Sequence, residues 1–429
     1  MKLFERLFKH ITLAFLLCFF APSTASSPNN EPTLQADSIE ISLLTCGPRQ
    51  QVYSLYGHTA IRFQDKQTGR DIAINYGVFS FDQPFFVLRF VFGLTDYEMG
   101  IAPFDIFEWE YDPTGCGVRQ QVLNLTAQEK MAIAQAVDRN MEPQNRVYRY
   151  NFFYDNCTTR ARDIIANNLN GRIVYDTSTP QHLNTSTPQH HNTPAQYPTF
   201  RNLIHNYNET HRWARFGNDL LLGVKADYNT TFEQQQFLPE RLCADFERAH
   251  IISADGTKRN LVSSSFWLFE PTTKQQSIQQ TNMSILDVFS PLVTFSILSI
   301  LTLIIAIVEY RRKRIIWVFD TSIMLTTGAC GLLLFAMIFS QHPTVSLNLQ
   351  ILLLNPINIF MLYSVTKAAR QNRIHWWTKA WSALILLLLA GSFLQSYAEG
   401  ITIVALSLLL RNISNIYTLK NTGSKQPEA

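Results

Sequence analysis

The hydrophobic pattern divides the chain near residue 286, where mixed polar and apolar positions give way to long apolar runs. The first run, PLVTFSILSILTLIIAIV, begins near Val288 and carries no charge. It is long enough to cross the roughly 30 Å hydrocarbon layer of a membrane. Further apolar segments occupy 315–339, 347–366, 380–395 and 399–417. We therefore predict an α-helical transmembrane bundle of about five helices over 286–418 and a cytoplasmic tail over 419–429.

The region before this bundle has the pattern of a mixed α and β domain. Apolar and polar positions alternate in IEISLLTC, HTAIRFQ and DIAINYGVF, which predicts three strands, and DKQTG supplies the turn between the last two. In RYNFFYDNCTTRARDIIANNL, polar residues give way to a helical period. A helix is therefore expected to begin at Cys157, with Asp155 and Asn156 as its caps.

A phenylalanine-rich segment, VFSFDQPFFVLRFVFGLTDYEMG, follows the third strand. It is too apolar for an ordinary exposed loop, yet Asp82 and Pro84 interrupt it. One interpretation is that it lines an acyl-binding pocket or lies at a lipid surface. On that interpretation the lipid-binding residues are Phe85, Phe86, Phe90 and Phe92. A buried helix of the domain core remains the alternative.

The first residues and one internal repeat fall outside the folded pattern. A basic start, an apolar stretch and small residues up to Ala25 predict a cleaved signal peptide over 1–25, with a retained anchor helix as the alternative. The tandem octads TSTPQHLN and TSTPQHHN predict a flexible insertion over 177–194. The exported domain is thus expected to cover 26–285.

Charge places the two halves relative to a membrane. The connectors RRKR and KAARQNRIHWWTK are basic, whereas SQHPTVS and QSYAEG carry no Lys or Arg. The positive-inside rule then puts the exported domain outside the cytoplasm, on a multi-pass protein of the inner membrane. Arg411 interrupts the last apolar segment, which leaves the fifth helix open. A net charge of +3 argues against a nucleic-acid partner.

The cysteines limit the chemistry. The six cysteines lack the close spacing of metal ligands, so neither a metal nor a cofactor is expected. Cys46 and Cys116 form a disulfide or remain free thiols, and the sequence leaves both open.

Cys157 and His58 are the candidate catalytic pair. Unpaired N–H groups and the positive end of the dipole at a helix N-terminus stabilise a thiolate, and the Cys157 N–H, next to the Asn156 cap, can donate to an oxyanion. His58 follows Gly57 at the start of a strand and is the candidate base. Asn75 or Tyr76 on the returning strand would orient its imidazole.

The segments ISLLTCGP, YSLYGHTAIRF, INYGVF, YNFFYDNCTTRARD and RFGNDLLLG resemble the Lnb family of lipoprotein N-acyltransferases, over most of 39–230. A histidine strand before a cysteine helix is also similar to the permuted papain-like order of NlpC-type enzymes. The resemblance implies an α+β permuted papain-like (NlpC-type) exported domain followed by the transmembrane bundle. The octad insertion departs from the family pattern.

The resemblance also implies a reaction, with lipidated lipoproteins and membrane phospholipid as partners. An acyl chain would move from the diacylglyceryl group of a lipoprotein to the α-amine of its lipidated cysteine through a thioester on Cys157. A lyso-form lipoprotein would remain. Two alternatives stay open. One is a cysteine peptidase or amidase acting on cell-wall peptides, and the other is a non-catalytic envelope protein that binds lipid or peptide.

Overall fold

Seven strands in the first half of the chain form one antiparallel sheet in the computed structural model, which describes residues 36–49, 51, 54–79, 84–112, 115–177, 197–272 and 289–423. Within these residues seven strands pair in the order β10-β5-β1-β2-β3-β4-β6. Their bounds are β1 (Ile39–Cys46), β2 (His58–Asp65), β3 (Asp71–Val78), β4 (Asp96–Pro103), β5 (Val118–Leu123), β6 (Val147–Arg149) and β10 (Val262–Phe269). The first three are the strands predicted from alternation.

Some sequence predictions fall outside the described residues. These are the signal peptide over 1–25, nearly all of the insertion over 177–194 and the end of the tail after 423. Below, the sheet domain means the described residues from 36 to 272, and the membrane bundle means 289–423.

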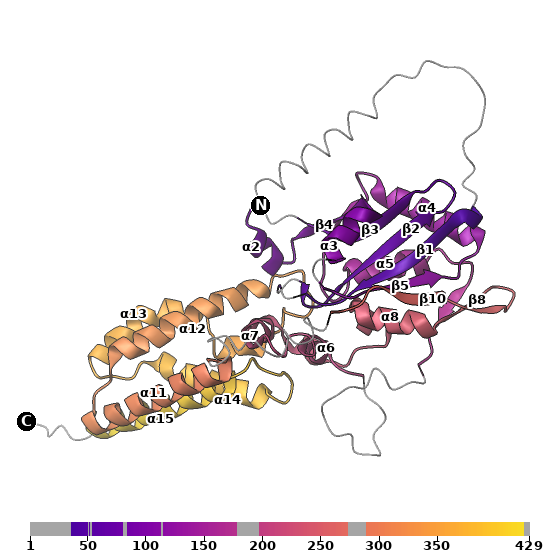
Figure 1. Ribbon diagram of the computed structural model, residues 1–429. Helices are drawn as coiled ribbons and strands as arrows, with labels where there is room; N and C mark the ends of the chain where they lie inside the picture. Colours follow the sequence, from indigo (N-terminus) through magenta and orange to yellow (C-terminus); the bar gives the residue numbers. More distant parts are fainter. Residues whose placement is uncertain are drawn as a thin grey trace, which may run out of the picture.

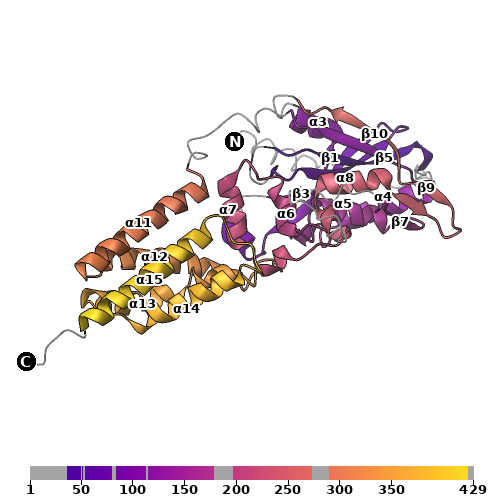
Figure 2. The ribbon, with the colours of Figure 1, turned by 90° about the horizontal axis from the view of Figure 1, so that it is seen from below.

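Helices cover both faces of the sheet (Figures 1 and 2). The face that carries Ile41, Ile61 and Ile74 packs against three helices in the largest core. These are α4 (Ala127–Met141), α5 (Cys157–Ala166) and α8 (Pro239–Arg248). The other face, with Leu44 and Ala73, packs against α3 (Phe104–Tyr111). Thr126 and Glu129 form a capping box at the start of α4.

Smaller elements connect the sheet to the membrane bundle. A second sheet of described residues has the order β7 (Arg172–Val174), β8 (His250–Ile252) and β9 (Lys258–Asn260), and its last two strands form a hairpin. Six short helices complete the described part of the sheet domain, namely η1 (Ala36–Ser38), α2 (Phe86–Val91), α6 (Phe200–His205), α7 (Arg212–Leu221), η5 (Val224–Asp227) and η6 (Glu233–Phe237).

The second half is helical, as the apolar runs predict (Figure 1). Its helices are α11 (Pro291–Arg312), α12 (Trp317–Met337), η7 (Leu349–Leu352), α13 (Ile357–Arg370), α14 (Trp376–Gly391) and α15 (Ile401–Gly423). Four segments of the described chain are long and apolar enough to cross a membrane. The last predicted segment, which Arg411 left open, is one of them. The fourth predicted segment is not, because its helix α14 has only 16 residues and is about 24 Å long.

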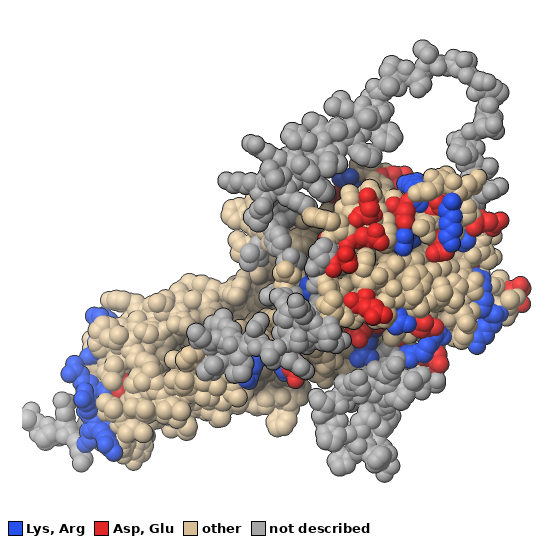
Figure 3. Space-filling view, viewed as in Figure 1, with Lys and Arg blue, Asp and Glu red and all other residues tan. Residues whose placement is uncertain are grey.

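Basic residues mark one end of the bundle. Lys313 and Arg314 follow α11, and Arg373 lies between α13 and α14. Figure 3 shows Lys and Arg gathered at the end farthest from the sheet domain, with an uncharged belt between. This distribution agrees with the predicted orientation, in which the sheet domain lies outside the cytoplasm.

A buried charge cluster explains how the last segment accommodates Arg411. The side chain is almost fully buried and donates hydrogen bonds to Glu309 at 2.8 Å and to Asp320 at 2.5 Å. These contacts join α15 to α11 and α12. Removing one partner from such a buried pair typically costs about 3–5 kcal/mol, because a charge is left without compensation.

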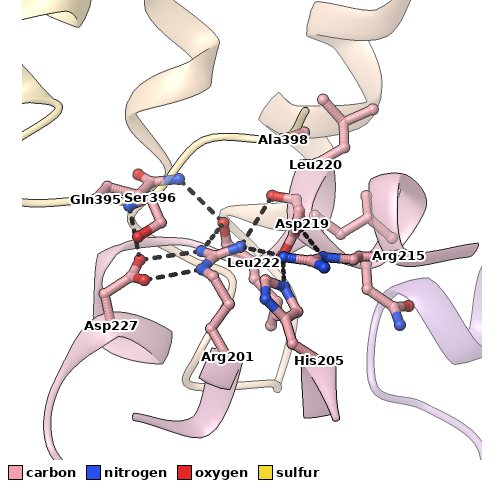
Figure 4. Close-up of polar contacts among 12 residues, drawn as sticks. Arg201, His205, Arg215, Asp219, Leu220, Leu222, Asp227, Gln395, Ser396 and Ala398 are labelled. Carbon is pink, nitrogen blue, oxygen red and sulfur yellow. Dashed lines mark hydrogen bonds and ion pairs between the residues drawn. The ribbon is translucent and has the colours of Figure 1, made fainter. Parts of the chain in front are cut away.

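A second polar cluster, the Arg201 junction, joins the sheet domain to the bundle (Figure 4). Arg201 on α6 is 1% exposed and forms ion pairs with Asp219 at 2.7 Å and Asp227 at 2.8 Å. From the bundle, Gln395 donates to the Leu222 carbonyl at 3.0 Å, and the Ser396 N–H donates to Asp227 at 3.2 Å. The junction thus fixes α7 and η5 against the loop before α15.

Helix α7 adds apolar and ionic contacts to this interface. The Trp213 indole donates to the Phe289 carbonyl at 2.9 Å, and the ring of Phe216 lies 5.2 Å from that of Phe295 on α11. Arg212 is paired with Glu399. The helix therefore lies along the outer end of the bundle, where a strongly amphipathic helix meets both lipid and water.

Candidate active site

Three elements bring a thiol, an imidazole and an amide to one end of the sheet. His58 is the first residue of β2, Asn75 lies on β3, and Cys157 is the first residue of α5. The buried hydroxyls of Thr59 and Thr158 lie 3.1 Å apart and join the start of β2 to the start of α5. The position of each group therefore follows from the packing of α5 on the sheet.

Gly57 controls how the chain enters β2. It adopts a φ of 77°, and a Cβ at this position would lie 2.6 Å from the carbonyl oxygen of Cys46. Only glycine accepts both constraints without strain. His58 can then pair with Cys46 across the β1–β2 ladder.

Asn75 occupies the orienting position beside His58. Its Oδ1 accepts hydrogen bonds from His58 Nε2 at 2.9 Å and from the Gly77 N–H at 2.6 Å. An amide oxygen only accepts, so Nε2 carries the proton and Nδ1 is available to a thiol. Tyr76, the other candidate, points to the opposite face, where its hydroxyl accepts from Asn140 at 3.0 Å. It does not fit the orienting position.

Of the two predicted caps of α5, Asp155 pairs with Arg160 instead, and the cap is Asn156. Its Oδ1 accepts from the N–H groups of Thr158 and Thr159, both at 2.9 Å, while its Nδ2 donates to the carbonyls of Phe152 and Phe237. These contacts occupy both ends of the amide, so Asn156 does not fit as an oxyanion donor. The Cys157 N–H lies in the first turn, where helices leave their N–H groups without internal partners.

The environment favours a charged form of both reactive groups. Burial raises the pKa of the Cys157 thiol, but the positive charge and hydrogen bond of His58 outweigh it and lower the pKa to about 7. Burial lowers the pKa of His58, and the Cys157 thiolate with the Asn75 hydrogen bond reverses this into a net rise. A thiolate and an imidazolium therefore stabilise each other at this site.

The pair lies in a pocket of about 200 Å³ whose two sides differ in polarity. Arg49 and Glu110 line one side and form an ion pair at 3.4 Å. On the other side the wall is a collar of aromatic rings, here called the aromatic collar, made of Tyr56, Phe79, Tyr97, Tyr150 and Phe152. Among the described residues no group of three or more His, Cys, Asp or Glu is placed to hold a metal ion.

Beyond the aromatic collar lies a larger apolar space of about 390 Å³, here called the interdomain cavity. The five collar residues line it as well, so the two spaces meet at the collar. Phe86 and Phe90 on α2 line it too, and the lipid-binding role predicted for them stays a prediction. Phe85 is 78% exposed and outside its lining, and Phe92 is also outside it.

Helix α2 is not the buried core helix that the sequence left as an alternative. Leu88 is 53% exposed and Phe90 41% exposed, although both are apolar. The C-terminal end of α2 contacts the loop after α12, where Ser340 donates to the Val91 carbonyl at 2.8 Å and the Gln341 N–H donates to the Phe92 carbonyl at 2.9 Å. The helix thus lies at the outer end of the bundle.

Cys46 and Cys116 are not joined by a disulfide, and both are buried in the core beside α3. Cys116 Sγ donates to the Gly47 carbonyl at 2.9 Å. Burial raises the pKa of each thiol, so neither is activated in the way that Cys157 is.

Comparisons with known families match the two halves of the chain separately. The model of the Lnb N-terminal periplasmic domain matches residues 27–202, and the model of the Lnb transmembrane domain matches residues 280–422. The chain belongs to the Lnb family. It is a membrane protein that processes lipoproteins and has a periplasmic N-terminal domain. No curated protein and no solved structure matches the chain.

Several site residues of this Lnb-family protein were not found from the sequence. The aromatic collar comes from four separate segments, and nothing local indicates that these segments meet. Gly77 had a signal, because a glycine inside a strand often marks a close approach. A Cβ at Gly77 would lie 2.8 Å from His58 Cε1, so this glycine makes room for the imidazole.

The pH dependence of Cys157 alkylation should be that of an unusually acidic thiol. Because its pKa is about 7, the thiolate is present above that pH and is lost as the pH falls below it. Iodoacetamide labelling, followed by peptide mass spectrometry from pH 5.5 to 9.5, should show a midpoint near 7. In His58→Ala the midpoint should rise to about 8.5 or above. The control His250→Ala should keep it, and equal midpoints in all three proteins would contradict the charge pair.

Gly77→Ala should slow the reaction of Cys157 with the reactive ester p-nitrophenyl acetate by about a hundredfold, because the added methyl displaces the imidazole. The release of p-nitrophenol in the first turnover measures this rate. Gly217→Ala is the matched control, since nothing lies within 4 Å of a Cβ there. Equal rates for the two variants would mean that His58 does not assist the thiol.

Proposed function

We propose that this protein is a thiol acyltransferase that moves an acyl chain from the diacylglyceryl group of a lipoprotein to the α-amine of its lipidated cysteine. A lyso-form lipoprotein is the product. The observation that carries the proposal is the Cys157 thiol, whose pKa His58 lowers to about 7, at the junction of a polar pocket and an apolar cavity. Such a junction suits a substrate with a polar head and a hydrocarbon tail.

The first half of the reaction forms a thioester. The Cys157 thiolate attacks the ester carbonyl of the glycerol-linked chain, and the Cys157 N–H stabilises the oxyanion that develops. The bond between the acyl carbon and the glycerol oxygen then breaks. The His58 imidazolium gives its proton to that oxygen, which leaves as a free hydroxyl. His58 is now neutral, and Asn75 keeps its ring in position.

The second half transfers the chain to nitrogen. The lipoprotein α-amine attacks the thioester carbonyl, neutral His58 accepts a proton from the amine, and the carbon–sulfur bond breaks. An amide and the original thiolate–imidazolium pair result, so atoms and charges balance without water. Glu110 and Arg49 provide the polar side of the pocket for the peptide part of the substrate.

The order of the catalytic groups supports a permuted papain-like domain, with the histidine strand before the cysteine helix. A peptidase or amidase could use the same pair with water as acceptor. The aromatic collar and the adjoining apolar cavity favour an acyl substrate over a peptide. A non-catalytic binding role does not require a lowered pKa at Cys157, whereas a nucleophilic thiol does. We assign the protein to the inner membrane, where diacylglyceryl lipoproteins and phospholipid meet the periplasm.

Mass spectrometry of lipoprotein N-termini tests this function in cells whose only N-acylating enzyme is this protein. The intact protein should yield N-acylated lyso-form lipoproteins, and Cys157→Ala should yield diacylglyceryl lipoproteins with free amines. Cys243→Ala is the matched control, because that buried thiol lies on α8 outside the pocket. Free amines with the intact protein, or full modification by the Cys157→Ala protein, would contradict the proposal.

A further inference from the structure

The interdomain cavity is built by both halves of the chain. Met337, His342, Thr344 and Val345 contribute its wall from the outer end of α12 and the loop that follows. None of these four lines the Cys157 pocket. These four residues therefore line the end of the cavity farthest from Cys157, and the aromatic collar lies between them and the thiol.

The described residues of the lining suit hydrocarbon and carry no stable charge. Burial lowers the pKa of His342, whose Nε2 lies 3.1 Å from the Phe90 carbonyl, so its imidazole stays neutral. Burial raises the pKa of the Tyr97 and Tyr150 hydroxyls, which stay protonated. A peptide or a sugar would leave its polar groups without partners here, whereas an alkyl chain would not.

The cavity also lies where lipid can reach it. Beside it, α2 exposes Leu88 and part of Phe90, and the end of α12 exposes Phe339 to 67%. These apolar side chains stand at the end of the bundle opposite its basic loops, at the level expected for the outer leaflet. Phe90 both lines the cavity and is partly exposed, so the cavity borders this apolar surface.

We propose that the interdomain cavity binds the acyl chain that Cys157 receives, and that Met337 and Val345 of the membrane bundle limit the length of that chain. This inference rests on the proposed function, since it assigns the tail of the same substrate. It makes the bundle part of the substrate site as well as an anchor. The ester carbonyl lies at Cys157, and the hydrocarbon extends through the aromatic collar toward α12.

Chain-length kinetics on the full-length protein test the assignment. The probes are p-nitrophenyl acetate, dodecanoate and hexadecanoate, with the first-turnover release of p-nitrophenol as readout. Val345→Trp fills the cavity and should slow dodecanoate at least about tenfold relative to acetate. Leu347→Trp is the matched control, because this residue is 56% exposed in the same loop and outside the lining. It should leave the ratio unchanged.

Met337→Ala provides the opposite change. It removes side-chain volume from the far end of the cavity and should shift the preference from dodecanoate toward hexadecanoate. If both cavity variants keep the chain-length profile of the unmodified protein, the assignment is wrong. A different failure, in which the unmodified protein shows no Cys157-dependent release even with acetate, would count against the proposed nucleophile.

Photolabelling tests the cavity without any catalysis. Full-length Cys157→Ala protein in phosphatidylcholine nanodiscs is exposed to palmitic acid with a diazirine at its methyl end. Labelled peptides should include 337–345, and Val345→Trp in this background should reduce that labelling at least about tenfold while Leu347→Trp does not. Labelling that Val345→Trp leaves unchanged would overturn the proposal, even if Cys157 proves to be the nucleophile.

Discussion

The Arg201 junction is the interaction on which the arrangement of the two halves depends. Arg201 is buried with two carboxylates. The loop before α15 adds hydrogen bonds to Asp227 and to the Leu222 carbonyl, and so ties this cluster to the bundle. A buried charge cluster is strongly destabilised when one partner leaves. The junction therefore holds α7 on the bundle, and α7 in turn forms one wall of the interdomain cavity through Asn218 and Leu221.

This arrangement addresses a physical problem of acyl chemistry at a membrane. A thiolate needs polar surroundings and a counter-charge, whereas an acyl chain needs an apolar space continuous with lipid. The sheet domain supplies the first through His58 and the start of α5, and the bundle supplies part of the second through Met337 and Val345. The aromatic collar forms the boundary between these two environments.

The features of this structure that depend on local sequence could be predicted. Alternation gave the three strands around His58, and cap chemistry gave the start of α5 at Cys157. The sequence left Asn75 and Tyr76 as equals, although residues one apart on a strand face opposite sides and only one can meet His58. The acidic partners of Arg411 lie 91 and 102 residues away, and those of Arg201 lie 18 and 26 residues away on other helices, so no pattern within one helix could reveal them. The aromatic collar was missed for the same reason.

The central claim is that Cys157 itself receives the acyl chain. A diacylglyceryl lipopeptide whose α-amine is acetylated can donate its chain but cannot accept it, so the reaction should stop at the thioester. Intact-protein mass spectrometry should then show one added acyl group, located on the Cys157 peptide and released by hydroxylamine. A protein that remains unmodified with this substrate, while it still N-acylates the free-amine lipopeptide, would contradict the account.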